Sequence, residues 1–308
     1  MAALPPFGAG PLLTDWGLDP GPAIGVLLTG GAYAWGVVRL HRRGRRWSPW
    51  RSASFGAGLL AIVVATQSAL GAYDTALFSV HVVQHLLLGV AAPFLMALGA
   101  PFTLALQATD RTTQVGLLWL IRSAPVRVLT HPLVGFAVFA LTLFALYFTP
   151  IYELSLRNDW VHSAVHLHFL LAGSLFFWAV IGLDPVANRL PYGARLIVVL
   201  LTVPFHAFLG IALLSGNTPL AADWYAGARD WGVSALTDQR TGAAIMWALG
   251  DVIGLVAGAV ILAQWMAHED RANLRARRAE ERQRTSTSAS VPAQSSASTS
   301  ASPPAVLP

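Results

Sequence analysis

Histidine is the residue type in this sequence that is best placed to do chemistry. The chain has nine histidines among 308 residues, and six of them fall within long apolar stretches or at their ends, where a polar side chain is costly unless it has a partner. These six are His81, His85, His162, His166, His168 and His206. Neutral imidazole is a ligand for copper, zinc and iron. The apolar stretches hold no cluster of carboxylates, which argues against a calcium or magnesium site.

The spacing of the histidines predicts one site built from three helices. His81 and His85 are four residues apart, and His162 and His166 repeat that spacing, so each pair lies on one face of a helix. His206 lies about halfway along an apolar stretch that runs in the opposite direction, and so it reaches the depth of His85. We therefore predict that His81, His85, His162, His166 and His206 bind a metal ion. Copper suits such a site, because the site has no thiol, opens outward and has a methionine nearby.

Three further residues have two interpretations each. His168 follows His166 by two positions, a rotation of about 200°, so it meets a different helix or holds one of the ligands in place. Met246 is either a thioether ligand or a packing residue. Asp251 is the one carboxylate deep in an apolar stretch, and it either bonds to a neighbouring helix or orients a metal-bound imidazole. The remaining histidines, His41, His131 and His268, lie among arginines and are not expected to bind metal.

The composition of the chain is that of a membrane protein. Hydrophobic residues make up 55% and charged residues only 11%, whereas a soluble domain has about 25% charged residues. The apolar blocks are long enough to cross about 30 Å of hydrocarbon as helices, whose backbone groups bond within each segment. We predict an all-α, polytopic membrane helical bundle with seven transmembrane helices, near residues 22–40, 53–72, 77–98, 132–151, 161–183, 195–215 and 241–266.

Two residue types are absent from the chain, and their absence narrows the possible chemistry. The sequence has no cysteine, which excludes disulfides, thiolate ligands and CxxC redox chemistry. It also has no lysine, so all twenty positively charged side chains are arginine and no Schiff base to retinal can form.

The distribution of arginine predicts the orientation in the membrane. Seventeen of the twenty arginines fall in segments on one side of the predicted spans, and positively charged segments stay in the cytoplasm. The N-terminus is therefore expected outside and the C-terminus in the cytoplasm, which puts the histidines toward the outer side. Arginine in these loops also accounts for the isoelectric point near 10.2, and no nucleic-acid binding is predicted.

The predicted spans and their orientation divide the chain into four parts. Residues 1–21 are expected to form an extracytoplasmic N-terminal segment without the features of a cleavable signal peptide. Residues 22–267 form the seven-span membrane domain, and residues 268–284, rich in Arg and Glu, extend the last helix into the cytoplasm. Residues 285–308 are a Ser/Thr/Ala/Pro tract that is too polar to bury a core, and we expect a disordered cytoplasmic tail.

Four separated segments resemble one protein family. The chain reads HVVQHLLLGVAAPFLMALGAP from His81, HSAVHLHF from His162, PFHAFLGIAL from Pro204 and DQRTGAAIMWALGD from Asp238. In this order and on these helices, the segments resemble the CtaG-type cytochrome c oxidase assembly factors, and the likeness covers roughly residues 23–267.

The resemblance implies a non-enzymatic role at the bacterial plasma membrane. It implies a multi-pass protein that presents copper for insertion into cytochrome c oxidase, whose subunits would be its partners, with His81, His85, His162, His166, His168 and His206 at the family's histidine positions. Two alternatives stay open. One is a haem-binding membrane electron carrier with histidine axial ligands, and the other is a copper transport protein, since relatives of this domain are fused to copper-uptake modules. The oligomeric state does not follow from the sequence.

Overall fold

The computed structural model of the chain describes residues 4–290, apart from the side chains of residues 13 and 285–290. All regular secondary structure among these residues is helical, which confirms the predicted all-α class. The chain divides into two compact units, Met1–Leu262 and Ala263–Pro308. The first unit holds the helical bundle.

Six segments of the described chain form helices that are long and apolar enough to cross a membrane. They are α2 (Pro20–Arg42); α3 (Pro49–Gln67) with α4 (Ala69–Tyr73); the run of α5 (Phe78–Leu86), η1 (Leu87–Ala91), α6 (Ala92–Leu98) and α7 (Pro101–Ala108); α12 (Asp159–Ile181); α13 (Tyr192–Leu200) with α14 (Thr202–Leu214); and α16 (Ala235–Ser290). These six correspond in position to six of the seven predicted spans.

The remaining predicted span, 132–151, is broken. The structure has α10 (Pro132–Tyr147) followed by α11 (Ile151–Arg157), and the two helices are bent by 69°. Pro150 lies at the break. Proline lacks an N–H and cannot continue the hydrogen-bond ladder of α10, so the helix ends before it. The bundle thus has six spans, or seven when this bent pair is counted as one.

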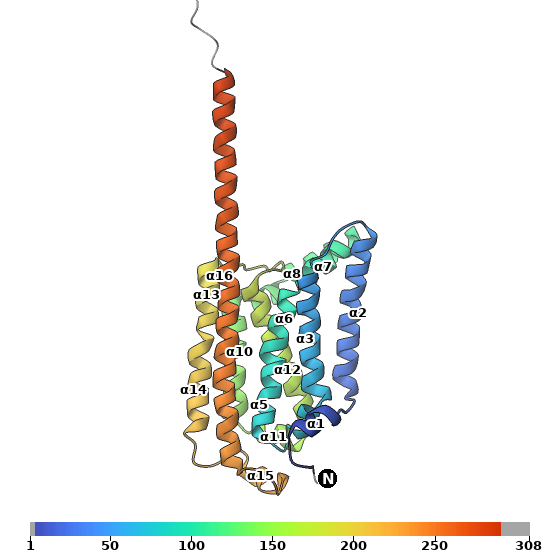
Figure 1. Ribbon diagram of the computed structural model, residues 1–308, viewed down its shortest axis with the longest axis vertical. Helices are drawn as coiled ribbons and strands as arrows, with labels where there is room; N and C mark the ends of the chain where they lie inside the picture. The colour runs from blue at the N-terminus through green and yellow to red at the C-terminus, as the bar shows by residue number, and fades with distance from the viewer. Residues whose placement is uncertain (1–3, 291–308) are drawn as a thin grey trace, which may run out of the picture. The chain divides into compact units, whose positions relative to one another are not determined.

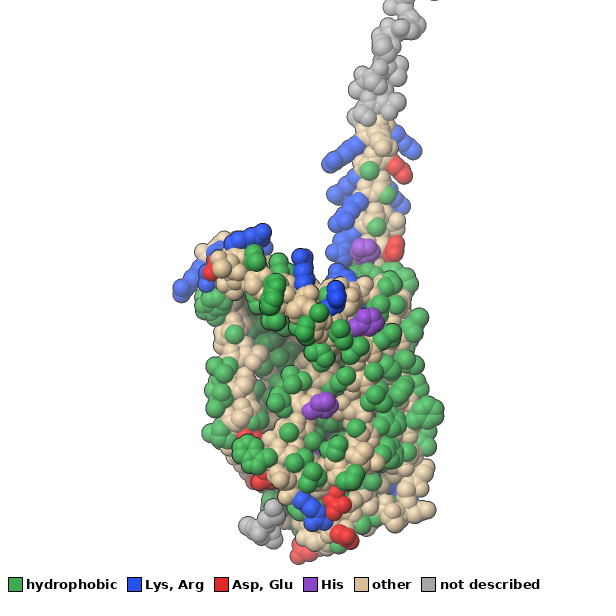
Figure 2. Space-filling view, turned by 180° about the vertical axis from the view of Figure 1, so that it is seen from behind, with side chains coloured by type: hydrophobic (Ala, Val, Ile, Leu, Met, Phe, Trp, Pro, Cys, Tyr) green, Lys and Arg blue, Asp and Glu red, His purple; other side chains and the backbone are tan. Residues whose placement is uncertain are grey.

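Short helices lie at the two ends of the bundle. One end carries α7 and α8 (Arg111–Arg122), which is followed along the chain by α9 (Ala124–Leu129), and the other end carries α1 (Ala9–Thr14), α11 and α15 (Ala222–Ala228) (Figure 1). On the face drawn in Figure 2, hydrophobic side chains form a band between an end with arginines and an end where the acidic side chains gather. A band of this kind is what the hydrocarbon layer of a membrane requires.

The sequence analysis predicts separate segments at the two ends of the chain, before and after the membrane domain. In the N-terminal segment, the carbonyl groups of Leu4 and Pro5 accept hydrogen bonds from Trp231 and Tyr73, so this segment is attached to the bundle. In the second unit, α16 continues as a helix through the charged stretch 268–284 to Ser290. The rest of the predicted tail, residues 291–308, lies outside the described residues.

The core that surrounds the histidines is made mainly of aromatic and aliphatic side chains from α5, α10, α12, α14 and α16. Buried members include Phe78, Phe139, Phe176, Leu209 and Met246. Because these helices are apolar on nearly all sides, the few polar side chains inside the bundle stand out as groups that need a partner.

Candidate metal centre

Helix α5 carries His81 and His85, and its start is fixed by a distant residue. Its N-cap residue, Leu77, offers no side-chain acceptor. The carboxylate of Asp238 on α16 takes that role, accepting hydrogen bonds from the backbone N–H of Phe78 at 2.7 Å and from Ser79 Oγ at 2.5 Å. Gly242 lets α16 approach closely, since a Cβ there would lie 2.6 Å from the Phe78 ring.

Helix α12 carries His162 and His166, and its first turn is capped locally. Asn158 Oδ1 accepts hydrogen bonds from the backbone N–H groups of Trp160 and Val161, as an N-cap side chain does. The four-residue spacing then places His162 and His166 on the face that looks toward α5, with the ring of His166 5.3 Å from that of His85.

The contact between these two helices is set one turn further along, at η1. Pro93 has no N–H to offer the carbonyl of Gly89, and the helix widens into a π-helical turn at Leu87–Ala91. Gly173 of α12 lies against that carbonyl oxygen, and any Cβ at this position would overlap it. Glycine at 173 is therefore what allows the backbones of α12 and η1 to meet and the histidine pairs to face each other.

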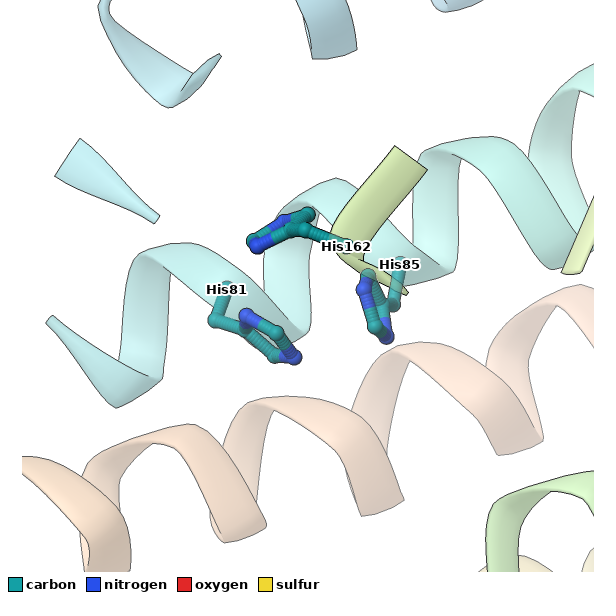
Figure 3. A group of neighbouring side chains, drawn as sticks. All are labelled: His81, His85 and His162. Atoms are coloured by element: carbon teal, nitrogen blue, oxygen red, sulfur yellow. The ribbon is translucent and has the colours of Figure 1, made fainter. Parts of the chain in front are cut away.

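Three imidazoles converge at the centre of this arrangement. One ring nitrogen from each of His81, His85 and His162 can be chosen so that the three lie within 4.8 Å of one another. The ring centroid of His81 lies 4.0 Å from that of His85 and 5.6 Å from that of His162. Figure 3 shows the ring of His162 beside the two rings of α5. A metal–nitrogen bond of about 2.1 Å allows two ligand nitrogens to be at most about 4.2 Å apart, so small ring rotations would suffice to bind one ion.

The ring nitrogens of His81 and His85 are available as metal ligands. Their exposed fractions are 0% and 3%, and neither ring nitrogen of either residue has a hydrogen-bond partner among the described residues. A buried polar group left without a partner costs about 1–3 kcal/mol. A metal ion would take up one lone pair on each ring, so the donor set fits a metal with affinity for imidazole nitrogen.

A second group of possible ligands lies beside the first. Asp74, in the turn that precedes α5, has Oδ2 3.3 Å from His162 Nε2, and the Nε2 atoms of His162 and His166 are 2.9 Å apart. Ligand atoms of Asp74, His162 and His166 all lie within 4.8 Å of one another. All three residues line an open polar pocket of about 240 Å³. His162 is thus a member of both groups.

His206 lies deeper and does not belong to either group. Its Nδ1 is 3.0 Å from the carbonyl oxygen of Thr202, and its Nε2 has no partner among the described residues. A cavity of about 20 Å³ is lined by His206, Met246 and His85, which is room for about one water molecule. The predicted set of five histidines therefore appears as four that gather between α5 and α12 and one across a small cavity from His85.

The two other candidates are also away from the convergent rings. His168 is half-turned from His166, as expected, and its Nε2 is 2.8 Å from Thr142 Oγ1 on α10. Asp251 follows Gly250, whose backbone lies against the His206 ring. The Oδ1 atom of Asp251 is buried without a hydrogen-bond partner among the described residues, so this oxygen orients no imidazole.

The sequence did not single out Asp74 or Asp238, although both position the site. Asp74 lies seven residues before His81, in the loop between two predicted spans. Asp238 begins the segment DQRTGAAIMWALGD. Two signals could have identified these residues. Asp74 shortly precedes a histidine pair, and Asp238 begins a segment that resembles a family motif.

The fold and the buried histidines define a multi-pass membrane protein with a candidate metal centre between α5 and α12. The chain belongs to the cytochrome c oxidase caa3 assembly factor family (Caa3_CtaG), whose model matches residues 31–268. This family membership confirms the resemblance seen in the four sequence segments.

Curated relatives come from mycobacteria. The chain is 35% identical to an uncharacterized protein of Mycobacterium leprae, over 85% of this chain and 41% of that protein. It is 36% identical to uncharacterized proteins of Mycobacterium bovis and Mycobacterium tuberculosis, over 84% of this chain and 40% of each relative. The chain thus spans about two fifths of the length of these relatives. No solved structure matches it.

Proposed function

We propose that this protein binds copper through its buried histidines and assists the insertion of copper into cytochrome c oxidase. The observation that carries the proposal is the convergence of His81, His85 and His162, with four buried ring nitrogens of His81 and His85 left without a hydrogen-bond partner. Membership of the caa3 oxidase assembly factor family supports the same conclusion. The protein acts as a metal chaperone and not as an enzyme.

Copper is favoured over other metals by the donor set. Three neutral imidazoles without a thiolate match copper or zinc, and among divalent ions copper binds more tightly than zinc at equal ligands in the Irving–Williams order. The buried thioether of Met246, which shares a cavity with His85 and His206, is a soft group that suits Cu(I) in particular. The metal is cargo in this proposal, received from one partner and given to an oxidase subunit.

The site is proposed to face the outer side of the bacterial plasma membrane. Helix α8, which carries Arg111 and Arg122, lies at one end of the bundle, and the positive-inside rule assigns that end to the cytoplasm. Asp74, His162 and the polar pocket beside them lie near the opposite end, where α5 and α12 begin. Copper would therefore reach the histidines from outside the cell.

The test is metal analysis of the full-length protein purified in detergent, before and after loading with copper. The double variant His81→Ala, His85→Ala should lose about 100-fold or more in copper affinity, since even the partners that orient a ligand are worth 10- to 100-fold. His41→Ala is the matched control, because His41 is exposed at the end of α2. The proposal is refuted if the double variant binds copper as tightly as the unaltered protein.

The same variants should be compared in cells. Correctly inserted His81→Ala, His85→Ala protein should yield an oxidase that is deficient in copper, whereas cells with His41→Ala should assemble a copper-replete oxidase. Excess copper in the medium should partly restore the oxidase. His131→Ala is a poorer control, because His131 Nδ1 accepts the backbone N–H of Leu133 at the start of α10.

Two other functions are separated by simple measurements. A haem electron carrier needs space for a porphyrin between its axial ligands, whereas the rings of His81 and His85 are 4.0 Å apart and leave none between them. An absorption spectrum with a Soret band would favour haem nonetheless. A copper transporter would move copper into vesicles that contain the purified protein, and an assembly factor would not.

A further inference from the structure

The two ligand groups differ in access to solvent while sharing one side chain. We define the outer group as Asp74, His162 and His166, and the inner group as His81, His85 and His162. A neutral imidazole has a single lone-pair nitrogen for a metal, so His162 completes one group at a time. Two groups with a common ligand are therefore alternative positions for one ion, and not two independent sites.

The outer group is the one that an ion from solvent meets first. Its three residues line the open polar pocket of about 240 Å³, together with Asp19 and Asp159. Three carboxylates around this pocket attract a cation. His81 and His85 are absent from the lining of the pocket, and both are buried behind His162.

The ligand chemistry of the two groups differs in charge. Asp74 brings a negative charge to the outer group, whereas the inner group consists of imidazoles alone and is surrounded by the rings of Tyr152 and Phe169. The cost of placing an ion in such low-dielectric surroundings grows with the square of its charge, and the carboxylate of Asp74 contacts His162 but is not a member of the inner group. A monovalent ion is thus tolerated in the inner group far better than a divalent one.

We propose that the ion binds first to the outer group and then passes to the inner group as Cu(I), with His162 as the ligand that stays with it. In the step, the bonds to Asp74 and His166 break and bonds to His81 and His85 form, with no change in oxidation state. Divalent ions such as Zn²⁺ stop at the outer group. This proposal rests on copper binding by the same histidines, and adds the order of binding and the selection by charge.

The test measures the rate and the equilibrium of Cu(I) binding separately, using the full-length protein in detergent under anaerobic conditions. Cu(I) is supplied from a coloured chelator complex, and the competition gives both quantities. Asp74→Asn should slow loading by about tenfold or more, because a steering charge is lost, while the equilibrium affinity changes by less than about threefold. Asp74→Glu, which keeps the charge, should restore most of the rate, and the retained equilibrium affinity of Asp74→Asn shows that the asparagine variant is folded.

Zn²⁺ provides the complementary measurement. His85→Ala should lower Cu(I) affinity by about 100-fold or more and leave Zn²⁺ affinity nearly unchanged, whereas Asp74→Asn should lower Zn²⁺ affinity. The inference is overturned if Asp74→Asn lowers Cu(I) affinity as much as His85→Ala does, which would mean a single site, or if it leaves the loading rate unchanged. Failure of the unaltered protein to bind Cu(I) at all would instead refute the proposed function.

Discussion

Asp238 caps a helix that begins 160 residues earlier in the chain: its Oδ2 accepts the backbone N–H of Phe78 at 2.7 Å. The bond joins the start of α16 to the first turn of α5. His81 lies in that same turn, so the carboxylate of Asp238 fixes both the end of the helix and the height of the first ligand. Asp184 has a similar role at α7, where it accepts the N–H groups of Phe102 and Thr103.

Replacement of Asp238 should therefore weaken both the fold and the site. We expect Asp238→Ala to destabilise the protein by about 1–2 kcal/mol, the usual value of an N-cap, and to lower copper affinity because α5 loses its fixed start. Thermal unfolding in detergent and chelator competition measure the two effects. Asp230→Ala, which removes an exposed carboxylate near the same end, is the control. Equal melting temperatures for the two variants would contradict the role assigned to Asp238.

Gly173 tests the contact that brings the histidine pairs together. Gly173→Ala places a Cβ on the Gly89 carbonyl oxygen, so we expect a loss of about 1–3 kcal/mol, as for other overpacked positions, and weaker copper binding. Gly25→Ala is matched, since Gly25 lies inside α2 with no atom within 4 Å of an added Cβ, and alanine there should be neutral or stabilising. A Gly173→Ala protein as stable as Gly25→Ala would show that α12 and η1 can separate without cost.

His206 should contribute less to copper binding than the sequence suggested. Because His206 lies outside the convergent group and faces the small cavity beside His85, His206→Ala is expected to lower Cu(I) affinity by less than about tenfold, within the range of residues that act through a ligand. Chelator competition on His206→Ala and His85→Ala, measured side by side, decides the question. If the two losses are equal, His206 is a direct ligand after rearrangement.

The proposed orientation can be checked with reporter fusions. A reporter that is active only in the cytoplasm should be active when fused after Arg284 and silent when fused after Asp74, because the arginine-rich segments are expected to stay inside. Activity at Asp74 would reverse the orientation and would place the polar pocket on the cytoplasmic side.

The sequence predicted positions along each helix far better than directions around it. The depths of His81, His85, His162 and His206 follow from counting residues along an apolar segment. Their rotation does not, because a helix that is apolar all round carries no amphipathic stripe to show which face meets which neighbour. This is why the facing pairs on α5 and α12 were found by their own four-residue spacing, while His206 was predicted to join them and lies outside both groups.

Features that depend on contacts between distant segments were missed for a related reason. The capping of α5 by Asp238 and the approach of Asp74 to His162 involve residues that have no local pattern in common. The break before Pro150 was signalled by the proline itself, yet the predicted span ran through it, since the apolar run continues to Ile151.

The π-helical turn at Leu87–Ala91 determines how α6, which follows it, is rotated about the helix axis relative to α5, which precedes it. A turn of this kind holds one residue more than an α-helical turn, and each residue advances the helix by about 100°. The residues after Ala91, among them Pro93 and Met96, therefore point in a different direction from the one they would have if the α-helix of His81 and His85 continued without a π-helical turn. Removing one residue from this turn, with every ligand intact, would rotate the histidines out of register with α12 by about a quarter of a revolution.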